Sequence, residues 1–258
     1  MEDRALEVIF CTPSALLKAA LFSFLWLIFF PIKESIMRFS HITLSLRFIV
    51  LLIHGMTLAA AAHAANGAAA VVMKTPAPIR IDGKGKEWTT ITATHPVMTP
   101  NGVVGTFKLA WDSQACYVLI EVTDASPRKN TATMLEDVFK RGDAVGLCFG
   151  PTDAGGVAQR LFLADVAGKP VALLQRPAAT EKKPHQYAVT AERGVTLDYV
   201  AAAPEVGVAF GDIPDGYRIE ASIPWRLLGY TPAEGLEFPF DVQLVFSDPA
   251  GTANTAVA

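Results

Sequence analysis

The sequence predicts an all-β protein, an antiparallel β-sandwich with a jelly-roll-like arrangement of strands. From Val71 onward, apolar residues recur with the alternating spacing of a half-buried strand rather than the spacing of a helix. The apolar runs are short, and Gly, Pro, Asp and Asn separate them. Because these residues favour turns, and because short strands at regular spacing are typical of sandwiches and jelly rolls, we expect this fold class.

About ten strands are expected, joined by short turns. They lie within residues 78–88, 105–124, 143–151, 159–177, 194–212, 216–225 and 238–248. Hairpin turns are predicted at 112–114 and 168–170, and brief helical turns at 133–140 and 225–229. After the last predicted strand the sequence holds at most part of another one, so one interpretation is a sandwich that lacks its last strand.

The N-terminal part differs in composition from the rest of the chain. Residues 37–64 have the basic start, apolar stretch and small-residue cleavage site of a secretory signal peptide. The apolar run at 15–32 has the length of a short transmembrane span, so residues 1–36 are either an over-extended start or a membrane segment. We expect a linker at 65–77 and one sandwich domain at 78–258, in a secreted, periplasmic or cell-envelope protein.

Charge and motifs exclude several function classes. The formal net charge is −3 and charged residues make up 18% of the sequence, with no run of Lys or Arg, so we expect no nucleic-acid partner. The sequence contains no GxSxG, HExxH, P-loop or GxGxxG motif. The exported part holds only His95 and His185 as histidines, which leaves little for His-based catalysis. We therefore expect no catalytic activity from this chain.

Cysteines and acidic residues raise two further questions. Cys116 and Cys148 lie in apolar runs, where they are either buried free thiols or, in an exported protein, one disulfide. Asp124 and Asp137, with Asp143 nearby, are candidate calcium ligands, because Ca²⁺ is bound by carboxylate oxygens. Their spacing fits no EF-hand loop, and the alternative is that they are solvated loop acids.

Tryptophans are candidates for stacking on a sugar ring, but each also has an interpretation as a core residue. Trp111 shares a strand face with apolar neighbours, and Trp88 follows a turn. Pro224 ends the strand before Trp225, and Gly229 suits the end of a short helical turn. We therefore expect Trp225 to cover one open end of the sandwich rather than to bind a ligand.

Five stretches, in this order, resemble the family 9 carbohydrate-binding modules and the wider group of DOMON-like sandwich domains. They are IRIDGKGKEW (79–88), FKLAWDSQACYVLIEVTD (107–124), RGDAVGLCFG (141–150), GYRIEASIPWRLLG (216–229) and FDVQLVFSD (240–248). The resemblance implies an exported, non-catalytic module that binds an oligo- or polysaccharide. Such modules are attached to glycoside hydrolases and take part in polysaccharide breakdown.

The resemblance also places a candidate site, with departures from the family pattern. A clamp tryptophan of the sugar-binding members corresponds to Lys140, with Phe139 beside it, and a sugar-binding Glu corresponds to Gly146. The second clamp tryptophan has no counterpart after residue 248. The clamp for a sugar reducing end is therefore not recognisable in this chain.

If a site is retained, we expect it around Phe139, Lys140, Arg141 and Asp143, with Arg160 opposite. Phe139 would stack on the sugar, Lys140 and Arg160 would donate hydrogen bonds, and Asp143 would accept them or bind calcium. The alternative is that these charged residues are merely solvated.

Two other functions remain open at this stage. Relatives of the same fold bind haem through axial Met or Lys ligands, for which Met98, Met134 and Lys140 are candidates without a clear pair. That resemblance implies an electron-transfer domain. The other alternative is a ligand-free structural module of the cell envelope.

Overall fold

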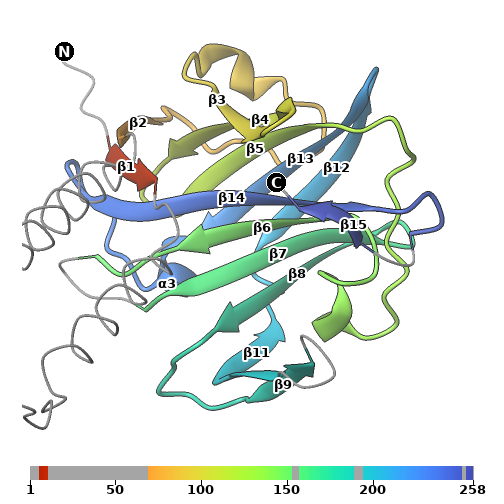
Figure 1. Cartoon of the computed structure of the whole chain (residues 1–258). Helices are drawn as coiled ribbons and strands as arrows, with labels where there is room; N and C mark the ends of the chain where they lie inside the picture. The colour runs from red at the N-terminus through yellow and green to blue at the C-terminus, as the bar shows by residue number, and fades with distance from the viewer. Residues whose placement is uncertain (1–5, 11–68, 153–156, 189–193, 252–253, 258) are drawn as a thin grey trace, which may run out of the picture. The chain divides into compact units, whose positions relative to one another are not determined.

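A computed structural model describes residues 6–10, 69–152, 157–188, 194–251 and 254–257. These residues form two antiparallel sheets packed as a sandwich, which confirms the predicted fold class (Figure 1). The predicted signal peptide at 37–64 and the apolar run at 15–32 lie outside the described residues. None of the helices in the described part of the chain reaches the length and hydrophobicity that a membrane span needs.

The first sheet has the strand order β11-β8-β7-β6-β14, and β15 pairs with β14. Its strands are β6 (Ala144–Phe149), β7 (Gln159–Val166), β8 (Lys169–Arg176), β11 (Tyr199–Ala202), β14 (Glu237–Ser247) and β15 (Asn254–Val257). All of its pairings are antiparallel. A separate two-stranded sheet joins β9 (His185–Ala188) to β10 (Gly194–Leu197).

The second sheet has the order β4-β5-β13-β12, and β3 pairs with β4. Its strands are β3 (His95–Thr99), β4 (Gly102–Trp111), β5 (Ala115–Thr123), β12 (Gly207–Ile213) and β13 (Gly216–Pro224). Two N-terminal strands, β1 (Leu6–Phe10) and β2 (Ala69–Lys74), connect the hydrogen-bonded path between the sheets, and β2 runs parallel to β4. β2 forms inside the stretch predicted as a linker.

Helical structure in the described residues is brief, as the sequence predicts. It consists of η1 (Glu87–Thr90), η2 (Leu135–Asp137) and α3 (Trp225–Leu228). α3 starts directly after Pro224 and ends at Gly229, whose φ of 72° lies in the left-handed region that glycine tolerates best.

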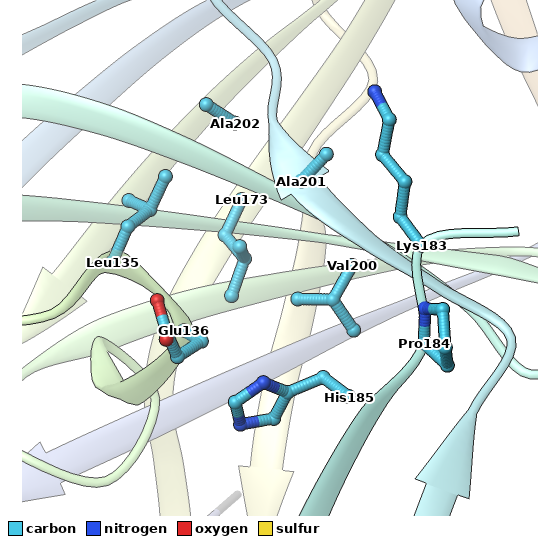
Figure 2. Close-up of a pocket in the computed structure, with 9 residues that line it drawn as sticks. All are labelled: Leu135, Glu136, Leu173, Lys183, Pro184, His185, Val200, Ala201 and Ala202. Atoms are coloured by element: carbon cyan, nitrogen blue, oxygen red, sulfur yellow. The ribbon is translucent and has the colours of Figure 1, made fainter.

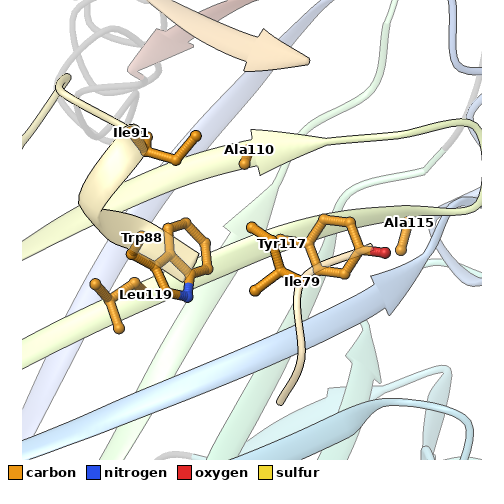
Figure 3. Packing of buried hydrophobic residues seen from close by; sticks show 7 residues of the cluster. All are labelled: Ile79, Trp88, Ile91, Ala110, Ala115, Tyr117 and Leu119. Carbon is orange, nitrogen blue, oxygen red and sulfur yellow. The ribbon is translucent and has the colours of Figure 1, made fainter. Parts of the chain in front are cut away.

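The core lies between the two sheets. The ring of Phe107 on β4 stands 5.7 Å from the ring of Phe240 on β14, so opposite layers are in direct contact. A second cluster lies on the face of the second sheet that points away from the first sheet, where Trp88 packs with Ile79, Tyr117 and Leu119 (Figure 3). Burial of such side chains is the main stabilising contribution to a fold of this kind.

All three predicted core tryptophans are buried: Trp88 is 1% exposed, and Trp111 and Trp225 are 3% exposed. The Trp225 indole donates a hydrogen bond to the carbonyl of Asp112 at 2.8 Å and meets Phe238 edge-on. The prediction that Trp225 covers the end of the sandwich is confirmed. Cys116 and Cys148 are free thiols, the first buried and the second half-buried, so they form no disulfide.

Candidate functional site

The face of the first sheet that points away from the second sheet, here called the outer face, carries the predicted site residues. Because side chains alternate along a strand and Phe240 faces the second sheet, Asp241 and Gln243 point the other way. Strand register extends this face into two rows across the sheet. The first row is Asp241, Cys148, Arg160, Gln175 and Val200, and the second row is Gln243, Gly146, Phe162, Leu173 and Ala202.

Phe139 reaches the outer face from the loop that follows η2. Its ring stacks on Phe162 with centroids 5.2 Å apart and an interplanar angle of 25°, and the ring of Tyr187 meets it edge-on at 5.0 Å. Gly146 makes room for this arrangement, because a Cβ there would lie 3.0 Å from Cε1 of Phe162. The ring of Phe162 therefore takes up space that a side chain at position 146 would need.

Lys140 lies against the same aromatic group. Its ammonium is 4.5 Å from the ring centroid of Tyr187 and 5.3 Å from that of Phe139, and it forms an ion pair of 3.4 Å with Asp137. Tyr187 accepts a hydrogen bond from the amide of Gln175 at 3.2 Å. Burial is the main cause that raises the pKa of Tyr187 to about 12, so its hydroxyl stays protonated at neutral pH.

Arg160 stands at the open side of this aromatic group. Its guanidinium lies 5.6 Å from the ring of Phe162, and its Nε donates to the sulfur of Cys148 at 3.3 Å. Asp241 lies two strands away in the same row, and both side chains are exposed to solvent. Desolvation by the neighbouring strands raises the pKa of Asp241, and the positive charge of Arg160 partly opposes that rise.

The structure thus brings together three predicted residues, Phe139, Lys140 and Arg160, around Phe162. The other two predicted residues are placed differently. Arg141 is exposed, and its backbone carbonyl accepts a hydrogen bond from the amide of Thr131. Asp143 is 3% exposed, which keeps it out of reach of a sugar on the surface.

Both carboxylate oxygens of Asp143 are used within the fold. One accepts from the backbone amide of Lys129 at 2.8 Å and the other from that of Ser247 at 2.7 Å. Asp143 therefore ties the loop at Lys129 and the end of β14 to the start of β6. Burial is the largest cause that raises its pKa, and these backbone hydrogen bonds oppose the rise.

The predicted calcium ligands do not form a calcium site. Asp137 is paired with Lys140, and Asp124 accepts hydrogen bonds from the amide and hydroxyl of Ser126 at 2.8 and 2.7 Å. Within the described ranges, no group of three or more His, Cys, Asp or Glu side chains could hold a metal ion. The oxygen-rich shell that Ca²⁺ requires is missing there, so these residues do not fit the ion.

The three candidate haem ligands do not line a common pocket in the described part of the chain. Met98 on β3 is 63% exposed and Met134 before η2 is 50% exposed, while Lys140 lies against Tyr187 and Phe139. A haem site needs a pocket with axial ligands directed into it. None of these three residues lines the cavity described next, so we do not assign them to haem.

A cavity of about 240 Å³ opens on the outer face on the other side of the aromatic group (Figure 2). Leu173 on β8 and Val200 and Ala202 on β11 form its apolar wall. Glu136 of η2 and His185 of β9 stand at its border.

Solved structures of similar fold include two carbohydrate-binding modules. No family model matches the chain, and no curated protein matches it. One structure is a carbohydrate-binding module of family 9 from Caldicellulosiruptor kristjanssonii in complex with cellotriose, 20% identical over 71% of this chain and 80% of that chain, with a TM-score of 0.43. A family 9 module from the same organism in complex with glucose is 18% identical over 70% of this chain and 80% of that chain, with a TM-score of 0.41.

The chain is similar in fold to family 9 carbohydrate-binding modules. The five sequence stretches quoted above fold into β4, β5, β6, β13 with α3, β14, and the start of η1 with the loop before it.

Several residues of the outer face were not predicted as site residues: Phe162, Tyr187, Asp241, Gln243, Glu136 and His185. Strand alternation could have found the first, because Phe162 follows Arg160 by two residues on one strand and must share its face. The same rule separates Asp241 from its core neighbours Phe240 and Val242. No sequence signal marks Glu136 or His185, since they belong to segments that only the tertiary fold brings together.

Proposed function

We propose that this chain is an exported, non-catalytic carbohydrate-binding module whose glycan site is the outer face of the first sheet. The observation that carries the proposal is the position of Arg160 and Asp241, which are exposed in one cross-strand row beside the Phe139–Phe162 stack. Sugar sites combine a few oriented polar groups with apolar or aromatic surface, and this row supplies both.

The division of roles follows from side-chain chemistry. Arg160 donates to sugar hydroxyls, Asp241 accepts from them, and the amide of Gln243 in the next row can do either. Lys140 provides a further donor at the aromatic border of the site. The partly covered ring of Phe139 offers its free edge to the apolar side of a pyranose.

Export supports this function but rests on the sequence alone. A secretory signal peptide at 37–64 would place the domain where polysaccharide is met. Membrane attachment through residues 15–32 is part of the proposal. The alternative is that residues 1–36 are an over-extended start.

A glycan array followed by calorimetry tests the proposal. Cellotriose and glucose, the sugars bound in the two similar structures, are the first ligands to titrate, followed by neutral and acidic polysaccharides. We expect saturable binding that the variant Arg160→Ala weakens at least tenfold, or about 1.4 kcal/mol. The control is Arg226→Ala, since Arg226 is an exposed arginine on α3, away from the outer face. No binding to any neutral or acidic glycan overturns the proposal.

A further inference from the structure

The cavity on the outer face has polar groups at its border that the fold does not use. Among the described residues, no hydrogen bond or ion pair engages the carboxylate of Glu136, which exerts only a through-space effect on Tyr187. The imidazole of His185 contacts the ring of Tyr187 at 4.4 Å between centroids, and its nitrogens have no hydrogen-bond partner within the described ranges. A donor–acceptor pair of this kind is free to meet a ligand.

The apolar wall of the cavity is built from two neighbouring strands, β8 and β11. Leu173 and Ala202 are register partners on neighbouring strands, and Val200 projects from the same side of β11 two residues earlier. Figure 2 shows these side chains between η2 on one side and His185 on the other. A ring with one apolar face can lie on Val200 and Ala202 of this wall while its edge meets Glu136 and His185.

The volume of the cavity suits a ligand of one ring. At roughly 30 Å³ for each water of liquid volume, 240 Å³ corresponds to about eight waters. This is the scale of one monosaccharide rather than of an oligosaccharide.

The charges around the cavity disfavour an anion. Lys183 lines one side, but its ammonium forms an ion pair of 3.3 Å with Glu181 and lies 5.2 Å from the ring of Tyr199. Figure 2 shows this ammonium directed away from Glu136 and His185. The charged group left at the border is thus the Glu136 carboxylate, which would repel a uronic acid.

We propose that this cavity is a second sugar-binding subsite, which takes one neutral pyranose ring. The apolar face of the ring lies on Val200 and Ala202, with the buried Leu173 beneath them, and its hydroxyls hydrogen-bond to Glu136 and His185. This inference rests on the proposed function for its class of ligand. Gln175 lies between Arg160 and Val200 in the first row and donates to Tyr187. The Tyr187–Phe139 group therefore stands between the cavity and the Arg160–Asp241 end of that row, so the two sites can be tested apart.

The test is an NMR titration of the exported domain with methyl β-D-glucopyranoside and methyl β-D-galactopyranoside, with glucuronate as the charged comparison. We expect saturable shifts of the Val200–Ala202 amides with at least one neutral glycoside, and at least fivefold weaker binding of glucuronate. Glu136→Gln and His185→Ala should each weaken the neutral sugar at least threefold, and Ala202→Phe, which fills the cavity, should abolish binding. Glu205→Gln, an exposed carboxylate in the turn after β11, is the matched control and should change nothing.

Several outcomes would contradict the inference. It fails if no neutral glycoside shifts these amides, if glucuronate binds as tightly as the neutral sugars, or if Glu136→Gln and His185→Ala both leave affinity unchanged. Glu136→Gln keeps the shape of an incompletely buried side chain, so its result stands even if Ala202→Phe disturbs folding. Arg160-dependent binding of oligosaccharide without any shift at the cavity would overturn this inference and leave the proposed function intact.

Discussion

Phe139 and Phe162 form an offset stack across the outer face, with ring centroids 5.2 Å apart. Phe139 comes from the loop after η2 and Phe162 from β7, so the stack fixes that loop on the sheet. It also forms the aromatic border beside Arg160. The rings of Phe139 and Phe162 therefore hold the loop in place and also form part of the candidate binding surface.

Replacing Phe139 with Ala should affect both stability and binding. The loss of a partly buried ring and its stacking contact should lower the free energy of unfolding by about 1–3 kcal/mol. Urea unfolding measures this change, and calorimetry on the folded variant should show weaker glycan binding. If Phe139→Ala leaves both quantities unchanged, the stack contributes to neither.

Trp225→Ala should destabilise the protein without involving the glycan site. The indole is almost fully buried and donates to the carbonyl of Asp112, so we expect a loss of about 3–5 kcal/mol and a lower melting temperature. Glycan affinity measured well below the melting transition should stay as in the unchanged protein. An unaltered melting temperature together with lost glycan binding would reverse the assignment of Trp225 to the core.

Glu220 holds the loop that precedes η1. This carboxylate is fully buried and accepts hydrogen bonds from the backbone amides of Asp82, Gly83 and Gly85 at 2.9, 2.6 and 2.9 Å. In Glu220→Gln the new NH₂ group would face a backbone donor, so we expect a loss of about 2–4 kcal/mol in chemical unfolding. Glu121→Gln is the comparison, because Glu121 lies on a neighbouring strand but is partly exposed in its ion pair with Arg218. A similar small effect of both changes would mean that the buried carboxylate is not needed.

The two thiols of the sandwich should differ in reactivity. Burial raises the pKa of Cys116 to about 12, so its reactive thiolate is rare at pH 8, whereas Cys148 is partly exposed beside Arg160. Alkylation at pH 8 followed by peptide mass analysis should label Cys148 and spare Cys116. An oligosaccharide bound in the Arg160 row should slow labelling of Cys148, and faster labelling of Cys116 than of Cys148 would contradict the structure.

Lowering the pH should weaken glycan binding, because it protonates the carboxylate of Asp241. Desolvation raises its pKa above the ordinary value of an aspartate, so protonation begins at a higher pH than for a free carboxyl group. Affinity should therefore be full above this pKa and fall as the pH drops through it. In Asp241→Asn this acidic limb should disappear, and an unchanged pH profile in that variant would exclude the carboxylate from the site.

The fold was predictable because single strands can be recognised from their own residues, by alternation of apolar and polar side chains or by short apolar runs between turn residues. The runs around Leu109 and Ile219 each show apolar and polar residues in turn, and the run around Leu147 is a short apolar stretch that Gly150 and Pro151 end. The strands that form in all three confirm the sandwich. β2 was missed as a strand, since its pairing with β1 and β4 depends on residues far away in the sequence.

The candidate site was predictable only in part. Phe139, Lys140 and Arg160 meet at the same place because the family resemblance aligns their segments. Asp143 looked like a surface acid, but the amides of Lys129 and Ser247, 14 and 104 residues away in sequence, draw it into the interior. Sequence alone carries no record of such long-range hydrogen bonds.

The most direct test of the account is a map of where a glycan touches the protein. Backbone amide shifts are recorded while cellotriose, or the tightest ligand from the glycan array, is titrated into the isotope-labelled protein. The account predicts that the largest shifts fall on Cys148, Arg160 and Asp241, and that Arg160→Ala removes them. Binding with its largest shifts on the second sheet, or shifts that persist in Arg160→Ala, would contradict it.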